Sequence, residues 1–186
     1  MEARAAVLPK AVSGRADGTP VVPADAAGFA EMVRAHQGMV HAIAWHFLRD
    51  RAGAEDVAQD VFLALYAHRR DITSQRHLLF WLRQTASRKC LDRRRRPSPE
   101  PLEAEPPAPA DPPADPWQRD RLRRLMTLLP AKPRMVLLLR YQQELAIEEI
   151  AAMLRMPPAT VKSHLRRGLA QLRRHWPVRP APGGPV

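Results

Sequence analysis

Three histidines in the N-terminal half, His36, His41 and His46, recur at intervals of five residues and are the first candidates for metal chemistry. On an α-helix that interval turns each side chain about 140° from the previous one, whereas two ligands of one metal ion need a shared face, as positions i and i+4 provide. Cys90 is the single cysteine, which excludes a disulfide within the chain and a zinc site made of several cysteines. We expect no metal, no cofactor, and Cys90 to be a small packed residue.

Catalytic motifs are also missing from the sequence. It contains no glycine-rich phosphate loop, no GxSxG nucleophile elbow and no carboxylate pair beside a residue that could act as a base. An enzyme that processes nucleic acid would need a metal site of clustered carboxylates or histidines, and the sequence does not offer one. We therefore predict a protein that is not an enzyme and has no catalytic residues.

The clearest chemical pattern is a basic helix near the C-terminus. Apolar residues mark a short helix over 147–154 and, after the break RMPP, a longer helix that begins near residue 158. Two helices around a tight turn are typical of a helix-turn-helix. The side of the longer helix opposite its apolar residues has no acid, which favours DNA reading over the alternative of a solvated basic surface. That side carries Thr160, Lys162, Ser163, Arg166, Arg167 and Arg174.

A second basic helix is predicted over residues 77–96, where many arginines accompany a single acid, Asp92. Such a helix can follow a phosphate backbone while polar side chains such as Gln84 and Ser87 touch bases. Phe80 and Trp81 are adjacent, so one of them is expected to pack in the core, with Trp81 the preferred one. The other is then available to stack on an unpaired base.

Glu55, Asp56, Gln59 and Asp60 form an acidic surface in an otherwise basic protein. One interpretation is that carboxylates early in a helix are stabilised by the helix dipole and need no partner. The other is a positively charged partner protein, because like charges at i and i+4 are mildly unfavourable on their own. The residues alone leave both open.

A proline-rich segment divides these patterns. Residues 97–116 contain nine prolines, five acids and no Lys or Arg, so this segment can neither form a helix nor bury a core. In an extended form the linker reaches roughly 60 Å. Apolar residues at helical spacing on both sides predict an all-α protein of two small helical domains joined by this Pro-rich linker. The predicted division is a tail over 1–26, domains over 27–96 and 117–176, the linker over 97–116, and a tail over 177–186.

The chain of 186 residues has 30 Lys and Arg against 19 Asp and Glu, a net charge of +11 that fits a nucleic-acid partner. No apolar stretch approaches the roughly 20 residues that a membrane-spanning helix needs, and the N-terminus has no signal-peptide pattern. We expect a cytoplasmic protein without direct membrane insertion.

Together, these blocks resemble the bacterial RNA polymerase sigma factors of the extracytoplasmic-function group, over residues 28–96 and 117–176. Residues 52–66 are similar to the family's core-polymerase-binding helix, residues 80–96 to its promoter-melting and −10-reading helix, and residues 128–174 to its −35-reading domain. The resemblance implies a transcription initiation factor that binds core RNA polymerase and promoter DNA, reads the −35 and −10 elements and promotes strand separation. It also implies an anti-sigma factor as a further partner. The alternative is a stand-alone helix-turn-helix regulator that never joins the polymerase.

The resemblance assigns roles position by position. It implies contacts with core polymerase for Asp56, Gln59 and Asp60. It implies contacts with the −10 element for Thr73, Ser74 and Gln75 in the loop before the melting helix, and for Phe80, Gln84, Ser87, Arg88 and Arg93 on that helix. It implies contacts with the −35 element for Thr160, Lys162, Ser163, Arg166 and Arg167.

The sequence departs from the family pattern at four positions. Arg88 stands where this group usually has Asn, which bears on the −10 preference. Glu144 and Ala146 replace a usual Gly and a capping Ser, and loss of a cap costs about 1 kcal/mol. Arg155 replaces a common turn Gly, a residue that accepts positive φ. We expect these changes to affect the turns more than the DNA-facing surface.

Overall fold

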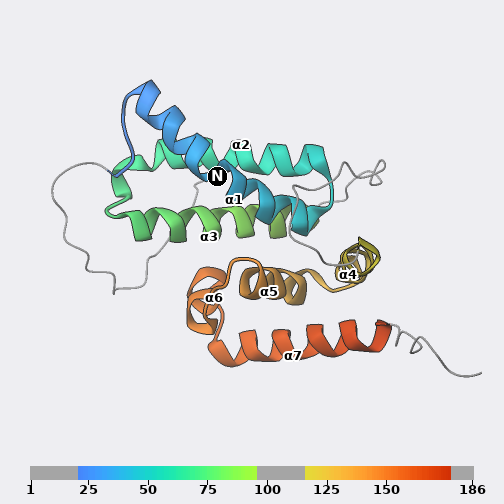
Figure 1. Ribbon diagram of the computed structural model, residues 1–186. Helices are drawn as coiled ribbons and strands as arrows, with labels where there is room; N and C mark the ends of the chain where they lie inside the picture. The colour runs from blue at the N-terminus through green and yellow to red at the C-terminus, as the bar shows by residue number, and fades with distance from the viewer. Residues whose placement is uncertain (1–20, 96–115, 177–186) are drawn as a thin grey trace, which may run out of the picture.

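The computed structural model describes residues 21–95 and 116–176, and every regular element in these ranges is a helix. This confirms the predicted all-α class, with the helix-turn-helix at the C-terminal end (Figure 1). The predicted linker, apart from Pro116, and most of both predicted tails lie outside the described residues. The helices are α1 Ala26–Leu48, α2 Arg51–Ala67, α3 Gln75–Arg95, α4 Pro116–Thr127, α5 Ala131–Tyr141, α6 Ile147–Leu154 and α7 Pro158–His175, with a 3-10 turn at Arg69–Asp71.

Helices α1, α2 and α3 form a bundle whose ends follow from local chemistry. Helix α1 begins after Asp25, whose carboxylate accepts the backbone N–H of Gly28 at 2.8 Å. It ends at Arg49, which takes the left-handed conformation with φ 59°. Val40, Ile43 and Phe47, spaced by three and four residues, are all fully buried, as the helical periodicity predicts.

The ordered part of the chain starts earlier than the sequence pattern predicts. The predicted N-terminal tail ran to residue 26, but Val22 lies in the core with 1% of its surface exposed. The tail prediction is therefore wrong for this stretch. Val21 and Val22 pack on the helical bundle, but they lie before α1 and show no helical periodicity from which the sequence could predict this packing.

Helix α5 forms the centre of the C-terminal half. All residues from Pro133 to Leu139 are buried, so this helix is covered on every side. Helix α7 crosses it closely at Gly168, where an added Cβ would lie 2.7 Å from Leu137 Cδ1. This close approach explains why glycine is accepted at a helical position that would otherwise favour alanine by about 1 kcal/mol.

The turns of the C-terminal half carry two strained residues. Glu144 and Arg155 have φ of 53° and 52°, the left-handed region that glycine adopts without strain. The resemblance leads us to expect Gly at both positions, and a residue other than Gly is strained in this conformation. Ala146 has no side-chain acceptor to cap α6, but Glu149 accepts the Ala146 N–H at 2.9 Å and supplies one half of a capping box.

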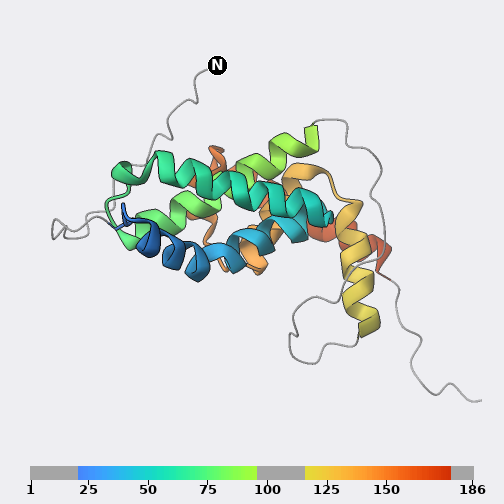
Figure 2. The ribbon, with the colours of Figure 1, turned by 90° about the horizontal axis from the view of Figure 1, so that it is seen from above.

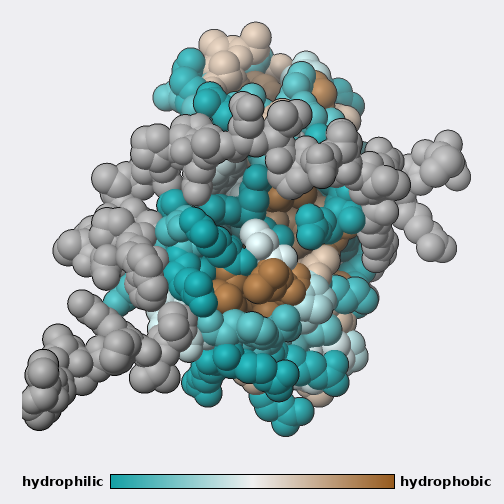
Figure 3. Space-filling view, turned by 90° about the vertical axis from the view of Figure 1, so that its right-hand side faces the viewer, coloured by the Kyte–Doolittle hydropathy of each residue, from teal (hydrophilic) through white to brown (hydrophobic). Residues whose placement is uncertain are grey.

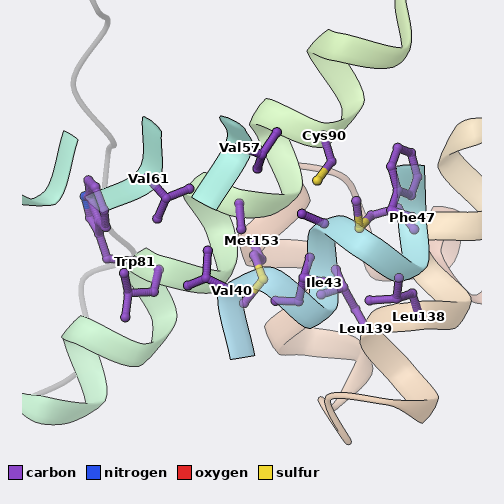
Figure 4. Close-up of a cluster of buried hydrophobic side chains, with 14 of the residues drawn as sticks. Val40, Ile43, Phe47, Val57, Val61, Trp81, Cys90, Leu138, Leu139 and Met153 are labelled. Atoms are coloured by element: carbon purple, nitrogen blue, oxygen red, sulfur yellow. The ribbon is translucent and has the colours of Figure 1, made fainter. Parts of the chain in front are cut away.

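The two halves pack directly on each other. Helices α5 and α6 lie against α1 and α3, which the two views in Figures 1 and 2 show as one layer beneath the other. Figure 4 shows Ile43 and Phe47 of α1 beside Leu138 and Leu139 of α5, with Met153 of α6 in the same cluster. A single buried cluster therefore runs through both halves.

Candidate nucleic-acid and polymerase interfaces

The residues predicted to read the −35 element lie together on the N-terminal half of α7. Lys162, Arg166 and Arg167 are exposed, and Thr160 and Ser163 are half-buried, while Val161 on the opposite side is fully buried. Pro158 occupies the first position of the helix, where its fixed φ and missing N–H are tolerated. The geometry presents the five side chains on one outward face.

Electrostatics reinforce the basic character of this surface. The pKa of His164 is lowered by its partial burial and by the neighbouring charges of Lys132 and Arg167. Two further cations, Arg173 and Arg174, occupy the last turn of α7, where they also complement the helix dipole. Helix α7 can therefore attract phosphate along most of its length.

The predicted −10-reading face of α3 is covered in this structure. Gln84 is 2% exposed and Ser87 0% exposed, although the sequence predicted that both touch DNA. The Gln84 side-chain amide donates to the Met153 carbonyl of α6 at 3.2 Å, and Arg83 Nε donates to Gln143 Oε1 at 3.3 Å. In this arrangement Gln84 and Ser87 cannot reach a base, because the polar face that suits DNA also packs against the other half of the chain.

The aromatic pair on α3 divides as predicted. Trp81 is buried, 5% exposed, and meets the His68 ring edge-on with centroids 6.3 Å apart. Phe80 is half-buried. Figure 4 shows Trp81 at one end of the buried cluster, which confirms it as the core residue and leaves Phe80 as the candidate for base stacking.

The loop before α3 is organised by hydrogen bonds to its own helix. Ser74 Oγ accepts the backbone N–H of His77 at 3.1 Å and so caps α3. The N–H of Thr73 donates to His77 Nδ1 at 3.3 Å. Burial lowers the pKa of His77, and the charge of Asp71 partly opposes this. Thr73 and Gln75 are exposed, so their side chains remain accessible to a base.

The acidic surface of α2 makes contacts that the sequence did not reveal. Asp56 pairs with Arg93 of α3 at 3.1 Å and Asp60 pairs with Lys89 of α3 at 3.0 Å, with Gln59 exposed beside them. The first turn of α2 contains no acid, so the helix dipole does not explain these carboxylates. The carboxylate side chains remain 61% and 60% exposed, which leaves them accessible to a partner.

An apolar groove lies next to this acidic surface. It has a volume of about 370 Å³ and is lined by Phe29, Val33, Phe62, Leu63 and Tyr66, among others. Leu63 is 62% exposed and Tyr66 44% exposed, so two large apolar side chains of the groove lie at the surface. The sequence analysis did not predict this groove. The signal that could have found it is the i, i+3 spacing of Leu63 and Tyr66 away from the buried face of α2.

A second apolar groove, also of about 370 Å³, lies among α4, α5 and α7. Its walls include Leu122, Tyr141 and Leu172, with His46 and Arg49 of α1 at its edge. Figure 3 views the molecule from the side where α4 lies and shows an apolar patch bordered by hydrophilic side chains. Leu122 and Tyr141 are exposed, so this surface also suits a protein partner.

Residues 21–95 and 116–176 contain neither a cluster of metal ligands nor a helix that could span a membrane. That part of the chain contains no group of three or more His, Cys, Asp or Glu side chains placed to hold a metal ion. Cys90 is fully buried, as predicted, and burial raises its pKa to about 12. None of the helices there is both long and apolar enough to span a bilayer.

Comparison with known proteins matches both halves to one family. Sigma-70 region 2 matches residues 32–98 and sigma-70 region 4 matches residues 119–172. The RNA polymerase sigma-E factor of Streptomyces coelicolor is 32% identical over 78% of this chain and 84% of its own length. The ECF RNA polymerase sigma factor SigW of Bacillus subtilis is 26% identical over 81% of this chain and 89% of its own length.

Solved structures show the same fold. The sigma factor RpoE from Bartonella quintana, solved with the anti-sigma factor NepR, superposes with a TM-score of 0.64 at 18% identity, over 78% of this chain and 94% of that one. CnrH, solved with the cytosolic domain of CnrY, gives a TM-score of 0.60 at 22% identity, over 81% of this chain and 88% of that one. The chain belongs to the bacterial RNA polymerase sigma factors, in the extracytoplasmic-function group.

Proposed function

We propose that this sigma factor directs core RNA polymerase to promoters by reading the −35 element with α7 and the −10 element with α3 and the loop before it. The observation that carries the proposal is the exposed face of α7, where Thr160, Lys162, Ser163, Arg166 and Arg167 stand together without an acid. Side chains near the start of a helix-turn-helix recognition helix enter the major groove, where arginine can bind guanine or phosphate.

The −10 element is assigned to the other half of the chain. Thr73, Ser74 and Gln75 offer hydrogen-bonding groups to a base held outside the duplex, and Phe80 offers a ring on which a base can stack. Gln84, Ser87, Arg88 and Arg93 continue along α3, where Gln84 and Ser87 become accessible to DNA only when α6 no longer covers them. Arg88, in place of the group's usual Asn, adds a cation that can bind phosphate or guanine.

Core polymerase is assigned to the acidic surface of α2. Asp56, Gln59 and Asp60 are exposed beside the apolar groove at Leu63, and a partner helix with basic and apolar side chains would match both features. In the existing pairs the carboxylates are 61% and 60% exposed and the Arg93 and Lys89 side chains 39% and 33% exposed, and exposed pairs typically contribute only about 0.2–1 kcal/mol. A partner can therefore replace them at small cost.

Three further assignments follow from this function. The protein contributes binding and strand separation and leaves the covalent chemistry to the polymerase, in the cytoplasm where the polymerase acts. An anti-sigma factor is a further partner. This assignment follows the structural relatives, because RpoE was solved with the anti-sigma factor NepR and CnrH with the cytosolic domain of CnrY. The linker, with its five acids, lies outside the described residues and is proposed to follow the polymerase's basic RNA path.

The decisive variant for this function is Asp56→Arg with Asp60→Arg. It should abolish co-elution with core polymerase, because it reverses both charges and repels a basic partner. The matched control is Glu144→Arg with Glu148→Arg, which changes the net charge equally on exposed positions of the C-terminal half and should still co-elute. Circular dichroism verifies that both double variants are folded. Normal co-elution of the α2 variant would support the stand-alone regulator instead, an alternative that the family comparisons do not favour.

A further inference from the structure

His77, in the first turn of α3, contacts the loop that is proposed to hold a −10 base. It is 7% exposed, which leaves its ring almost no surface for DNA. We infer that His77 is a positioning residue of the −10 site: it holds Thr73 and Ser74 in the conformation that receives the base. The inference rests on the function proposed above and adds a residue that the −10 site needs but that DNA does not contact.

His77 and the loop exchange hydrogen bonds in both directions. Ser74 Oγ accepts the backbone N–H of His77 at 3.1 Å, and the Ser74 carbonyl accepts the Leu78 N–H at 2.9 Å. In return, His77 Nδ1 accepts the backbone N–H of Thr73 at 3.3 Å. A capping box has the same plan, with Glu or Gln three residues after the capping Ser reaching back to the backbone. His77 occupies that position with a ring nitrogen and reaches one residue further back, to Thr73.

The ring holds Thr73 as a neutral imidazole with its proton on Nε2. Nδ1 accepts an N–H, so it carries no proton itself. Thr73 Oγ1 lies 3.3 Å from the same nitrogen and can therefore only donate to it. Burial lowers the pKa of His77 and favours this neutral form, against the opposing charge of Asp71. Both polar groups of Thr73 that face the ring are thus oriented by it.

Buried residues anchor the loop at both ends. Ile72 is 4% exposed and Leu78 1% exposed, and both belong to the buried cluster. Between these anchors Thr73 is exposed and Ser74 is half-buried, so their polar groups stay available to a base. A binding site whose groups are already held in place loses less conformational entropy when the ligand arrives. Removing the Nδ1 acceptor should therefore weaken base recognition although no contact with DNA is removed.

His77→Leu and His77→Asn separate the acceptor from the bulk of the side chain. Leucine keeps an apolar side chain without an acceptor, whereas the asparagine amide oxygen can take the place of Nδ1. The probe is a pool of short single-stranded DNA of random sequence, selected on holoenzyme made from the full-length chain and core polymerase, and then sequenced. We expect the parent to enrich a motif. His77→Leu should lose the base preference at one position of that motif about fivefold or more, and His77→Asn should keep it within about twofold.

Val40→Ala is the matched control for a loss of stability. Val40 is fully buried in α1 of the same half and is assigned neither to DNA nor to polymerase. Its truncation should lower Tm, measured by circular dichroism alongside the His77 variants, and leave the whole motif intact. If Val40→Ala lost the same base preference as His77→Leu, reduced stability alone would explain both results and the inference would be overturned.

Hydrogen exchange reads the loop directly in the free full-length chain. The Thr73 amide, followed by NMR, should exchange about fivefold faster in His77→Leu than in the parent and at nearly the parent rate in His77→Asn. Equal Thr73 exchange in the parent and His77→Leu would overturn the inference, as would an unchanged motif in His77→Leu or an equal loss in His77→Asn. Failure of the proposed function differs from these outcomes, because the parent holoenzyme would then enrich no motif while Thr73 exchange still responds to His77→Leu.

Discussion

Arg134→Met should make the protein more stable, because it removes a charge that the fold buries at a cost. Arg134 is 1% exposed, and two of its side-chain nitrogens have no hydrogen-bond partner among the described residues. Burial, together with the nearby Arg94 and Arg49, lowers the pKa of Arg134 from 12.5 to about 10. A tenfold change in proton affinity corresponds to about 1.4 kcal/mol, so holding this charge costs the folded chain about 3 kcal/mol.

The contact of the guanidinium with Phe47 offsets part of that cost. A cation over an aromatic ring contributes about 1 kcal/mol, and methionine replaces the packing of the arginine stem. The expected net gain is about 2 kcal/mol in the free energy of unfolding, which corresponds to a rise in Tm of roughly 4–8 °C. Urea unfolding followed by circular dichroism measures the gain.

Two controls make the Arg134 result specific. Arg134→Lys keeps a buried charge and should show no gain, whereas Arg174→Met, at an exposed position of α7, should change stability by less than about 0.5 kcal/mol. A loss of stability in Arg134→Met would refute the reasoning, since it would mean that the guanidinium is satisfied where it lies.

Two further predictions concern DNA binding and pH. Arg167→Glu should weaken the binding of the holoenzyme to a promoter fragment about tenfold or more and reduce the salt dependence of that binding. The control Arg124→Glu makes the same charge change outside the α7 face and should have neither effect. Equal effects of the two variants in a salt titration would speak against α7 as the reading helix. Burial lowers the pKa of His77, so the folded chain disfavours the protonated ring and the free energy of unfolding should fall as pH drops through the ordinary value of about 6.5. The same pH series on His77→Gln should be flatter, and parallel curves would disprove the role of His77.

Local patterns in the sequence were sufficient for the helices and for the choice between neighbouring aromatics. Trp81 falls in phase with Leu78 and Leu82 on the buried side of α3, while Phe80 lies out of phase, so helical periodicity separates them. The strain at Arg155 was also predictable, because a turn position that usually holds glycine requires positive φ whichever residue occupies it.

What the sequence could not predict depends on contacts between distant segments. Periodicity places Gln84 and Ser87 on a polar face, but it does not say whether DNA or α6 covers that face. The pairing of Asp56 with Arg93 depends in the same way on the packing of α2 against α3. Val22 was missed because two residues are too few to show a period.

The most direct test of the central claim is run-off transcription with purified core polymerase, the full-length protein and genomic DNA fragments. This account predicts discrete transcripts that appear only when both proteins are present and that are lost with Asp56→Arg plus Asp60→Arg. Transcripts that are the same with and without the protein, or none from any fragment despite stable assembly with the polymerase, would contradict it.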